Sequence, residues 1–245
     1  MAEIALLHVD GHLDEAQALG LLASLKSLPG KFENLGAIIL RLRVAGGSLG
    51  AAQAAAEGVA FFREELEIPV VALVIESALS AGYYLAASCD HIVAAEAALI
   101  GGVGAITRNL NFSELMSKIG IEYSCISSGD GKDMYFPLAT RNAVQNELVG
   151  DIVNEQSKQF LKFIQFRRAL NNAHIDEIRN GCVFNGSDAL QYNLIDEIGG
   201  FFAAISACVR IGKMDDMTIQ SVEPYNQSQS VSNAFLSSLA ALMRI

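Results

Sequence analysis

A serine lies at the junction between an apolar run and a helix-like stretch of the sequence. The run PVVALVI (69–75) is followed by ESALS, which ends at Ser80. The small residues Ala78, Ala81 and Gly82 leave room for a substrate backbone to approach this hydroxyl. Such a hydroxyl can act as a nucleophile if a base and an oxyanion hole are close. It can equally be a helix N-cap that accepts a backbone hydrogen bond, and the local sequence leaves both readings open.

The base for such a serine is a histidine or a lysine. Lys132 differs from most lysines of the chain because it lies in a glycine-flanked loop, GDGKD (129–133), and not on an amphipathic helix. A lysine base must be neutral, which burial favours and the neighbouring carboxylates of Asp130 and Asp133 oppose, so spacing alone favours a surface role. A Ser-His-Asp triad is disfavoured because no histidine has an evident carboxylate partner; the histidines are His8, His12, His91 and His174.

A glycine turn, AGGS (45–48), follows the apolar run GAIILRLR (36–43). The carboxyl ends of neighbouring parallel strands lie at the same edge of a sheet, where open α/β folds place their sites. We therefore expect the N–H groups of this turn to face the same point as Ser80, where they could stabilise an oxyanion.

The elements around these residues alternate between strand-like and helix-like patterns. Repeated strand–helix units predict an α/β fold with helices packed on mostly parallel strands. Predicted strands cover 4–9, 36–43, 69–75, 91–94 and 121–127. Predicted helices cover 14–27 (stopped by Pro29 and Gly30), 49–66, 80–88 and 111–120, a long stretch that ends near 171, and shorter stretches near 187–193 and 201–211.

The length of 245 residues allows one large domain, and we assign 1–222 to a single domain. Residues 223–245 form a linker-like stretch and a short apolar tail. We expect this tail to dock on the body or on a neighbouring subunit, with peripheral membrane contact as the lesser alternative.

The composition excludes several classes of function. The net charge of −10 argues against a nucleic-acid surface, which requires a basic stripe. The sequence has no apolar run of 18 residues, and its start, MAEIALLHVDG, does not resemble a signal peptide. The four cysteines lack metal-ligand spacing, so we expect no metal and no cofactor.

Five segments of the chain resemble, in order, the signal peptide peptidase A (SppA, protease IV) family, whose members are serine proteases with the ClpP/crotonase superfold. The resemblance covers about residues 4–200, and no single motif decides it. The five segments are LRLRVAGGSL, SALSAGYYLAASCDHIVA, LIGGVGAI with NFSELMSKIGIEY, SSGDGKDMYFPLAT and VFNGSDALQYNLIDEIGG.

The resemblance implies a Ser–Lys dyad that cleaves peptide bonds without a cofactor. It places the nucleophile on Ser80, the general base on Lys132 and the oxyanion donors on the backbone N–H groups of Gly47 and Ala81. It further implies signal-peptide-like or other extended apolar substrates and a homo-oligomeric ring, in which a neighbouring subunit can supply the lysine. The compartment is then the cytoplasm, or the chain is the soluble domain of a membrane-associated bacterial protease.

Several positions depart from the family pattern. The glycine turn, usually Ser-Pro-Gly-Gly, reads Val-Ala-Gly-Gly over 44–47, and Ala81 replaces a glycine. Gly102 stands where a serine thought to steady the lysine is usual. These departures motivate an alternative, a non-catalytic member that binds peptides or scaffolds a ring. A crotonase-type acyl-CoA enzyme is a further alternative, although no carboxylate lies between Glu96 and Glu114 to serve its chemistry.

Overall fold

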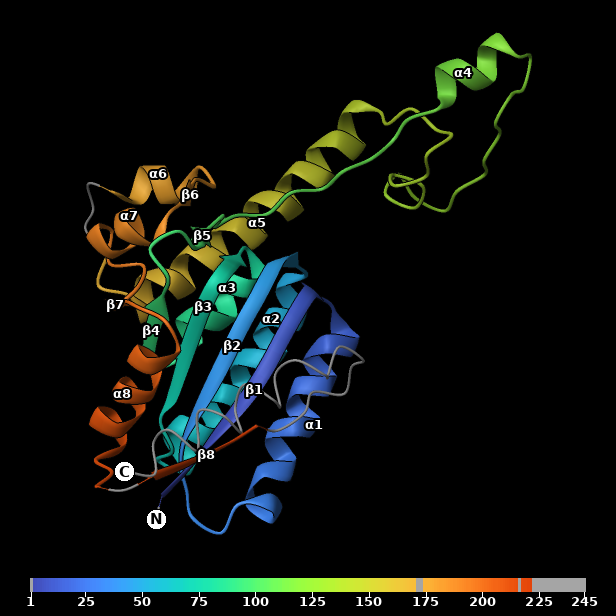
Figure 1. The fold of residues 1–245 in the computed structure, drawn as a ribbon. Coiled ribbons are helices and arrows are strands. Elements are labelled where there is room, and N and C mark those ends of the chain that lie inside the picture. Colours follow the sequence, from blue (N-terminus) through green and yellow to red (C-terminus); the bar gives the residue numbers. More distant parts are fainter. Residues whose placement is uncertain (1, 171–173, 216, 222–245) are drawn as a thin grey trace. The chain divides into compact units, whose positions relative to one another are not determined.

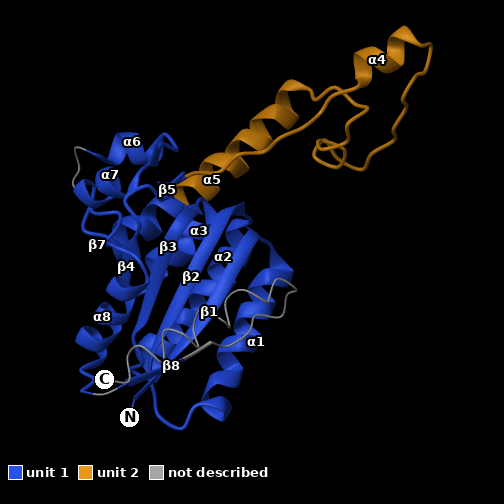
Figure 2. Cartoon of the chain, in the orientation of Figure 1, with its two compact units in different colours: residues 1–103, 160–245 blue, residues 104–159 orange. Residues whose placement is uncertain are grey.

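The computed structural model describes residues 2–170, 174–215 and 217–221. The chain divides into two compact units, which Figure 2 distinguishes by colour. Unit 1 comprises residues 1–103 and 160–245, and unit 2 comprises residues 104–159. The predicted linker and tail at 223–245 lie outside the described residues, so their docking stays a prediction.

Unit 1 is built on one sheet, which has eight strands among the described residues. The main path of the sheet runs β6-β5-β3-β2-β1-β8, and β4 and β7 extend it beside β3. Every pairing is parallel except that of β5 with β6. The strands are β1 (Ala2–Leu13), β2 (Leu35–Gly47), β3 (Val70–Leu79), β4 (His91–Ala94), β5 (Leu99–Gly101), β6 (Val183–Phe184), β7 (Glu197–Ile198) and β8 (Met217–Ser221).

Helices cover both faces of this sheet (Figure 1). On one face, α1, α2 and α3 pack over the larger hydrophobic cluster, and α8 packs over the smaller cluster on the other face. This arrangement confirms the predicted α/β class with a mostly parallel sheet. The helices of unit 1 are α1 (Glu15–Lys31), α2 (Leu49–Ala60) with the π-helical turn η1 (Phe61–Glu65), α3 (Ala81–Ser88), α6 (Ile175–Arg179), α7 (Gly186–Gln191) and α8 (Phe201–Gly212).

The central strands are apolar on both sides because both faces of the sheet are covered. In β2, Ile38 and Leu40 point into the larger cluster, whereas Ala37 and Ile39 point into the smaller one. All four side chains are fully buried. The continuous apolar runs in the sequence thus reflect burial on two faces.

Strand β3 brings two neighbours together along one edge. Its first half pairs with β4, so that Val71 lies opposite His91, and its end pairs with β5, so that Leu79 lies opposite Gly101. Ser80 follows Leu79 directly, so it lies at the carboxyl end of β3, beside β5. The fold therefore places the serine at the sheet edge where α/β proteins bind ligands.

Unit 2 contains α4 (Ser113–Lys118) and the first turns of α5 (Ala143–Arg167), the helix that continues into unit 1. Of the residues described in unit 2, only Gln145 and Val149 are buried. Many large apolar side chains of this unit are exposed, among them Ile106, Leu110, Leu115, Ile119, Ile121, Ile126 and Leu148.

Two predictions about local structure are wrong. The segment 121–127 has no regular structure, although IEYSCIS alternates like a strand, because no ladder partner lies beside it. Helix α1 does not stop before Pro29 but runs through it to Lys31. A proline so near the end of a helix removes only one of its last hydrogen bonds, and Phe32 still donates to the carbonyl of Leu28 at 3.0 Å.

Within the described parts of the chain, we find no helix with the length and hydrophobicity that crossing a membrane requires.

Candidate active site

Ser80 has an unusual backbone conformation. Its φ of 52° and ψ of −118° lie outside the regions that non-glycine residues favour, and such strain persists only where surrounding contacts enforce it. The Ser80 N–H donates to the carbonyl of Gly101 at 2.8 Å, and the Ser80 carbonyl accepts from the N–H of Tyr84 at 3.0 Å. Strand β5 and the first turn of α3 therefore hold the serine backbone from both sides.

The Ser80 hydroxyl does not cap the helix that follows it. Ser80 occupies the N-cap position of α3, but its side chain makes no capping hydrogen bond. Ser48, which occupies the N-cap position of α2, has an extended backbone, and its hydroxyl accepts from the N–H of Ala51 at 3.1 Å. The comparison within one chain removes the capping interpretation of Ser80 and leaves its hydroxyl available for chemistry.

The two predicted oxyanion donors lie against each other. A Cβ built on Gly47 would come within 2.9 Å of the Cβ of Ala81. Ala81 is the first residue of α3, and the first N–H groups of a helix have no acceptor within the helix. The sheet register explains why Gly47 reaches this point, because it lies opposite Leu13 at the carboxyl end of β2, one strand away from β3. Gly47 thus lies against Ala81, the residue that follows Ser80.

Small residues make this close approach possible. A Cβ on Gly47 would lie 2.2 Å from the carbonyl oxygen of Leu13, and a Cβ on Gly82 would lie 2.6 Å from the Cβ of Val44. Gly82 therefore lets α3 pack directly on β2, whereas Gly47 lets the end of β2 reach the start of α3.

Gly102, one of the positions at which the sequence departs from the pattern of the family it resembles, lies next to Ser80. Its φ is +64°, and a Cβ there would be 3.4 Å from the backbone nitrogen of Ser80. The Gly102 N–H donates to the carbonyl of Cys182 at 2.9 Å, which ties this turn to the residue before β6. Glycine suits the positive φ, and this chain has no hydroxyl at this position to steady a lysine.

The predicted base belongs to the other unit. Lys132 lies in unit 2, in a turn where its N–H donates to the carbonyl of Gly129 at 3.2 Å, and its side chain is exposed. The carboxylate of Asp133, which could stabilise the lysine ammonium, accepts a hydrogen bond from Gln145 at 2.8 Å. Ser80 thus belongs to unit 1 and Lys132 to unit 2, and the structure describes each residue within its own unit.

Of the four histidines, only His12 lies beside the glycine turn. In the sheet register it lies opposite Gly46, and a Cβ on Gly46 would be 4.0 Å from the His12 Nδ1 atom. His91 lies opposite Val71, nine residues before Ser80 along β3, which corresponds to about 30 Å of strand. The other two are His8, whose Nδ1 atom lies 3.2 Å from the Arg41 guanidinium, and His174, in contact with the ring of Tyr192.

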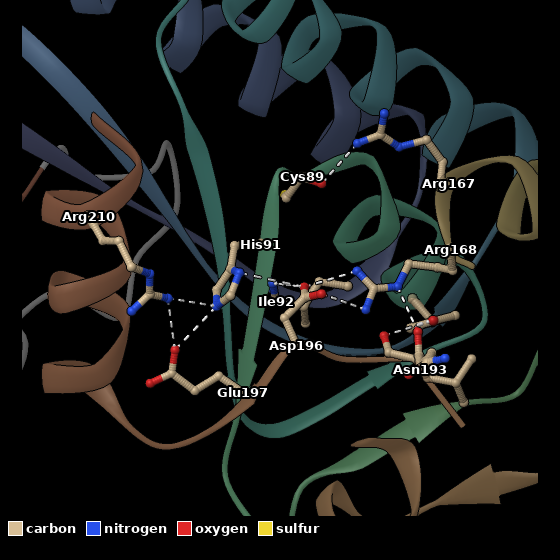
Figure 3. Close-up of polar contacts among 11 residues, drawn as sticks. Cys89, His91, Ile92, Arg167, Arg168, Asn193, Asp196, Glu197 and Arg210 are labelled. Atoms are coloured by element: carbon tan, nitrogen blue, oxygen red, sulfur yellow. Dashed lines mark hydrogen bonds and ion pairs between the residues drawn. The ribbon is translucent and has the colours of Figure 1, made fainter. Parts of the chain in front are cut away.

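The C-terminal end of α3, the helix that follows Ser80, is held by Arg167, a residue that was not among the predicted site residues. Its guanidinium donates to the carbonyls of Ala87, Ser88 and Cys89 at 2.9–3.1 Å. Figure 3 shows Arg167 reaching the Cys89 carbonyl. A cation at this end of a helix also interacts favourably with the helix dipole. No sequence motif marks Arg167; only the close approach of α5 to α3 reveals its role.

Aromatic side chains attach the same helix along its length. The ring of Tyr84 stacks on that of Phe163 with centroids 3.9 Å apart and planes 9° apart. The fully buried Tyr83 donates its hydroxyl hydrogen to the carbonyl of Leu194 at 2.9 Å, and burial raises the pKa of this phenol. All eight residues of α3 are buried, so the helix is a rigid support for the residue that precedes it.

A polar network near the Arg167 contacts holds β4 and β7 in place (Figure 3). Arg168 forms a bidentate ion pair with Asp196 at 2.9 Å, and the Asp196 carboxylate accepts from the N–H of Ile92 at 2.7 Å. His91 and Arg210 both contact the Glu197 carboxylate, at 3.3 and 3.1 Å. These charged groups are thus engaged in ion pairs and hydrogen bonds that join β4, β7 and α8.

Comparison with known proteins decides the family. Residues 63–211, more than half of the chain, match the model of Peptidase family S49. The chain belongs to peptidase family S49. This confirms the resemblance to signal peptide peptidase A, and the matched region includes Ser80, Ala81, Gly102 and Lys132.

Three relatives of this S49 chain carry protease names. It is 27% identical over 173 residues to "Putative signal peptide peptidase SppA" of Enterococcus faecium, covering 71% of this chain and 50% of the relative. It is 28% identical over 222 residues to "Protease 4" of Haemophilus influenzae, covering 86% and 34%. It is 28% identical over 142 residues to "Serine protease SPPA, chloroplastic" of Arabidopsis thaliana, covering 56% and 20%. The chain thus spans about half or less of the length of these relatives.

Proposed function

We propose that this S49 chain is a serine endopeptidase in which Ser80 is the nucleophile and Lys132 the general base. The observation that carries the proposal is the non-capping Ser80, held at φ 52° and followed by Ala81, against which Gly47 lies. A strained, preorganised hydroxyl beside two N–H donors is what acyl transfer to serine requires. Family membership and the protease names of the relatives support the same reaction class.

In the proposed reaction, the neutral amine of Lys132 takes the hydroxyl proton of Ser80 as the serine oxygen attacks the peptide carbonyl carbon. The N–H groups of Gly47 and Ala81 stabilise the oxyanion of the tetrahedral intermediate. When the carbon–nitrogen bond breaks, the Lys132 ammonium gives its proton to the leaving amine. Water then attacks the acyl-enzyme, Lys132 accepts a water proton, and the Ser80 oxygen is released and reprotonated.

The exposed position of Lys132 in unit 2 bears on how this base becomes neutral. Desolvation favours a neutral amine, and unit 2 itself supplies little of it. We therefore propose that the chain works as a homo-oligomer and that a neighbouring subunit covers or shares the lysine loop. The exposed apolar side chains of unit 2, such as Ile119, Ile126 and Leu148, support an interface there. The resemblance implies a ring.

We propose extended, apolar peptides as substrates. Segments similar to signal peptides are included because the relative from Enterococcus faecium is named a signal peptide peptidase. Such a peptide can add to the exposed edge of a sheet by backbone hydrogen bonds. The small residues around Ser80 leave space for a substrate backbone.

The experiment that tests this proposal is hydrolysis of a fluorogenic peptide with small apolar residues, from pH 6 to 10. Wild type is compared with Ser80→Ala, Lys132→Ala and His12→Ala. We expect the first two variants to lose at least about a thousandfold in kcat/KM, whereas His12→Ala keeps its rate. Inactivity of the wild type would favour a non-catalytic, peptide-binding member of the family. Loss of activity in His12→Ala but not in Lys132→Ala would assign the base to the histidine.

A further inference from the structure

Gln145 connects the loop that carries Lys132 to the start of α5. Its side-chain Nε2 atom donates to the carbonyl of Asp130 at 2.7 Å and to the Oδ1 atom of Asp133 at 2.8 Å. These acceptors lie on both sides of Lys132 in the sequence. Gln145 is 8% exposed, and it is one of only two buried residues described in unit 2. Burial of a polar side chain is tolerated when its hydrogen bonds are satisfied, as they are here.

A capping box fixes the orientation of this amide. The N–H of Asn142 donates to the Oε1 atom of Gln145 at 3.0 Å, and the N–H of Gln145 donates to the Oδ1 atom of Asn142 at 2.8 Å. This is the reciprocal pattern of a helix N-terminus, with the glutamine three residues after the cap. Because Oε1 accepts from a backbone N–H, both Nε2 hydrogens point at Asp130 and Asp133.

We infer that Gln145 is a positioning residue for the general base. The inference rests on the proposed role of Lys132. Gln145 has two effects on the lysine: it fixes the loop backbone at Asp130, and it holds the carboxylate of Asp133 in a hydrogen bond to an amide. A carboxylate released from Gln145 would be free to approach the lysine one residue away and favour its ammonium form.

Three titratable groups, Tyr123, Cys125 and Glu122, line one cavity of unit 2 together with Asp133. The pKa of the Tyr123 phenol is raised by its hydrogen bond with Cys125 and by the negative charge of Asp133. Tyr123 therefore remains neutral through the lower part of the tested pH range. Tyr123 therefore does not contribute to the acid limb of the rate profile.

Gln145→Glu is the variant that separates positioning from capping. A glutamate at 145 keeps the oxygen that accepts from Asn142, and glutamate is a preferred residue at this position of a capping box. It cannot donate to Asp130 or Asp133, and it adds a negative charge beside the loop. A purely structural role in capping therefore predicts wild-type kinetics for this variant, whereas a positioning role predicts impaired kinetics.

We expect the acid limb of kcat/KM in Gln145→Glu to move by about one pH unit to higher pH, with about a tenfold lower rate at pH 7. KM should change less than kcat. The matched control is Gln159→Glu, an exposed position of the same helix whose amide contacts only Glu155 at 3.4 Å. Adding Asp133→Asn to Gln145→Glu should return the acid limb toward its wild-type position.

The inference fails if Gln145→Glu has the wild-type profile, if Gln159→Glu has the same shift, or if Asp133→Asn does not restore the limb. Loss of the helical circular dichroism signal in Gln145→Glu would also contradict the capping-box argument. Lys132→Ala, measured alongside, distinguishes failure of the proposed function from failure of the inference about Gln145. If it keeps its activity, the proposed function fails and takes the inference with it, whereas an inactive Lys132→Ala with a normal Gln145→Glu overturns the inference alone.

Discussion

Gly47 and Ala81 lie so close together that a Cβ on Gly47 would come within 2.9 Å of the Cβ of Ala81. One residue ends β2 and the other begins α3, so their contact joins the glycine turn to the helix that follows Ser80. The contact therefore brings the backbone of two separate elements together at the residue that follows Ser80. The oxyanion hole that we propose depends on this junction.

Gly47→Ala should therefore impair catalysis. Its Cβ would clash with the carbonyl oxygen of Leu13, 2.2 Å away, and the end of β2 must move. Loss of one oxyanion donor costs about 100-fold or more in kcat. We expect a loss of this size in peptide hydrolysis. The matched control is Gly50→Ala, because nothing lies within 4 Å of a Cβ at that position; equal losses in both variants would argue against the assignment of Gly47.

Arg167→Ala should destabilise the fold and helix α3 together. Three carbonyls at the end of α3 would lose their donor. A buried acceptor left unsatisfied lowers the free energy of unfolding by about 1–3 kcal/mol. Urea unfolding measures this change. Arg179→Ala, which removes an exposed ion pair with Asp176, should cost less than about 1 kcal/mol. A similar stability for the two variants would show that the contacts of Arg167 with α3 contribute little to the stability of the fold.

The sequence predicts the α/β class and the sheet edge that bears Ser80, because long apolar runs and small residues at strand ends carry that information. It does not reveal whether the Ser80 hydroxyl caps α3, because Ser48 and Ser80 both precede helices and only their backbone angles differ. The error at 121–127 has a related cause: alternation predicts a strand but cannot show whether another strand lies beside it. Arg167 acts through contacts across 80 residues, which no local pattern encodes.

The four cysteines should differ in their reactivity toward a thiol reagent. Burial raises the pKa of the Cys89 and Cys208 thiols to about 12, whereas Cys125 and Cys182 are exposed. Since the thiolate is the reactive form, the native protein at pH 8 should show two fast thiols, and all four should react in denaturant. Mass spectrometry identifies the labelled positions. Rapid labelling of Cys89 in the native protein would contradict the rigid packing of α3.

Stability should fall as the solution becomes more acidic than about pH 6.5. Burial lowers the pKa of His8 in the folded protein, and the neighbouring Arg41 adds to this effect. The unfolded chain then binds a proton that the folded chain excludes, so the stabilisation is complete above the unfolded pKa and is lost as pH falls toward the folded one. Urea unfolding between pH 7.5 and 5.5 should show this decrease, and His8→Asn should show a smaller one. An equal decrease in both proteins would assign it to other groups.

The most direct test of the central claim is to trap the acyl-enzyme and locate it. A small apolar peptide ester is mixed with the protein, the reaction is quenched in acid, and the modified residue is identified by mass spectrometry of the digested chain. The account predicts an acyl group on Ser80 of the wild type, the same adduct in Ser48→Ala, and none in Ser80→Ala. An adduct on another residue, or peptide cleavage by Ser80→Ala at the wild-type rate, would show that Ser80 is not the nucleophile.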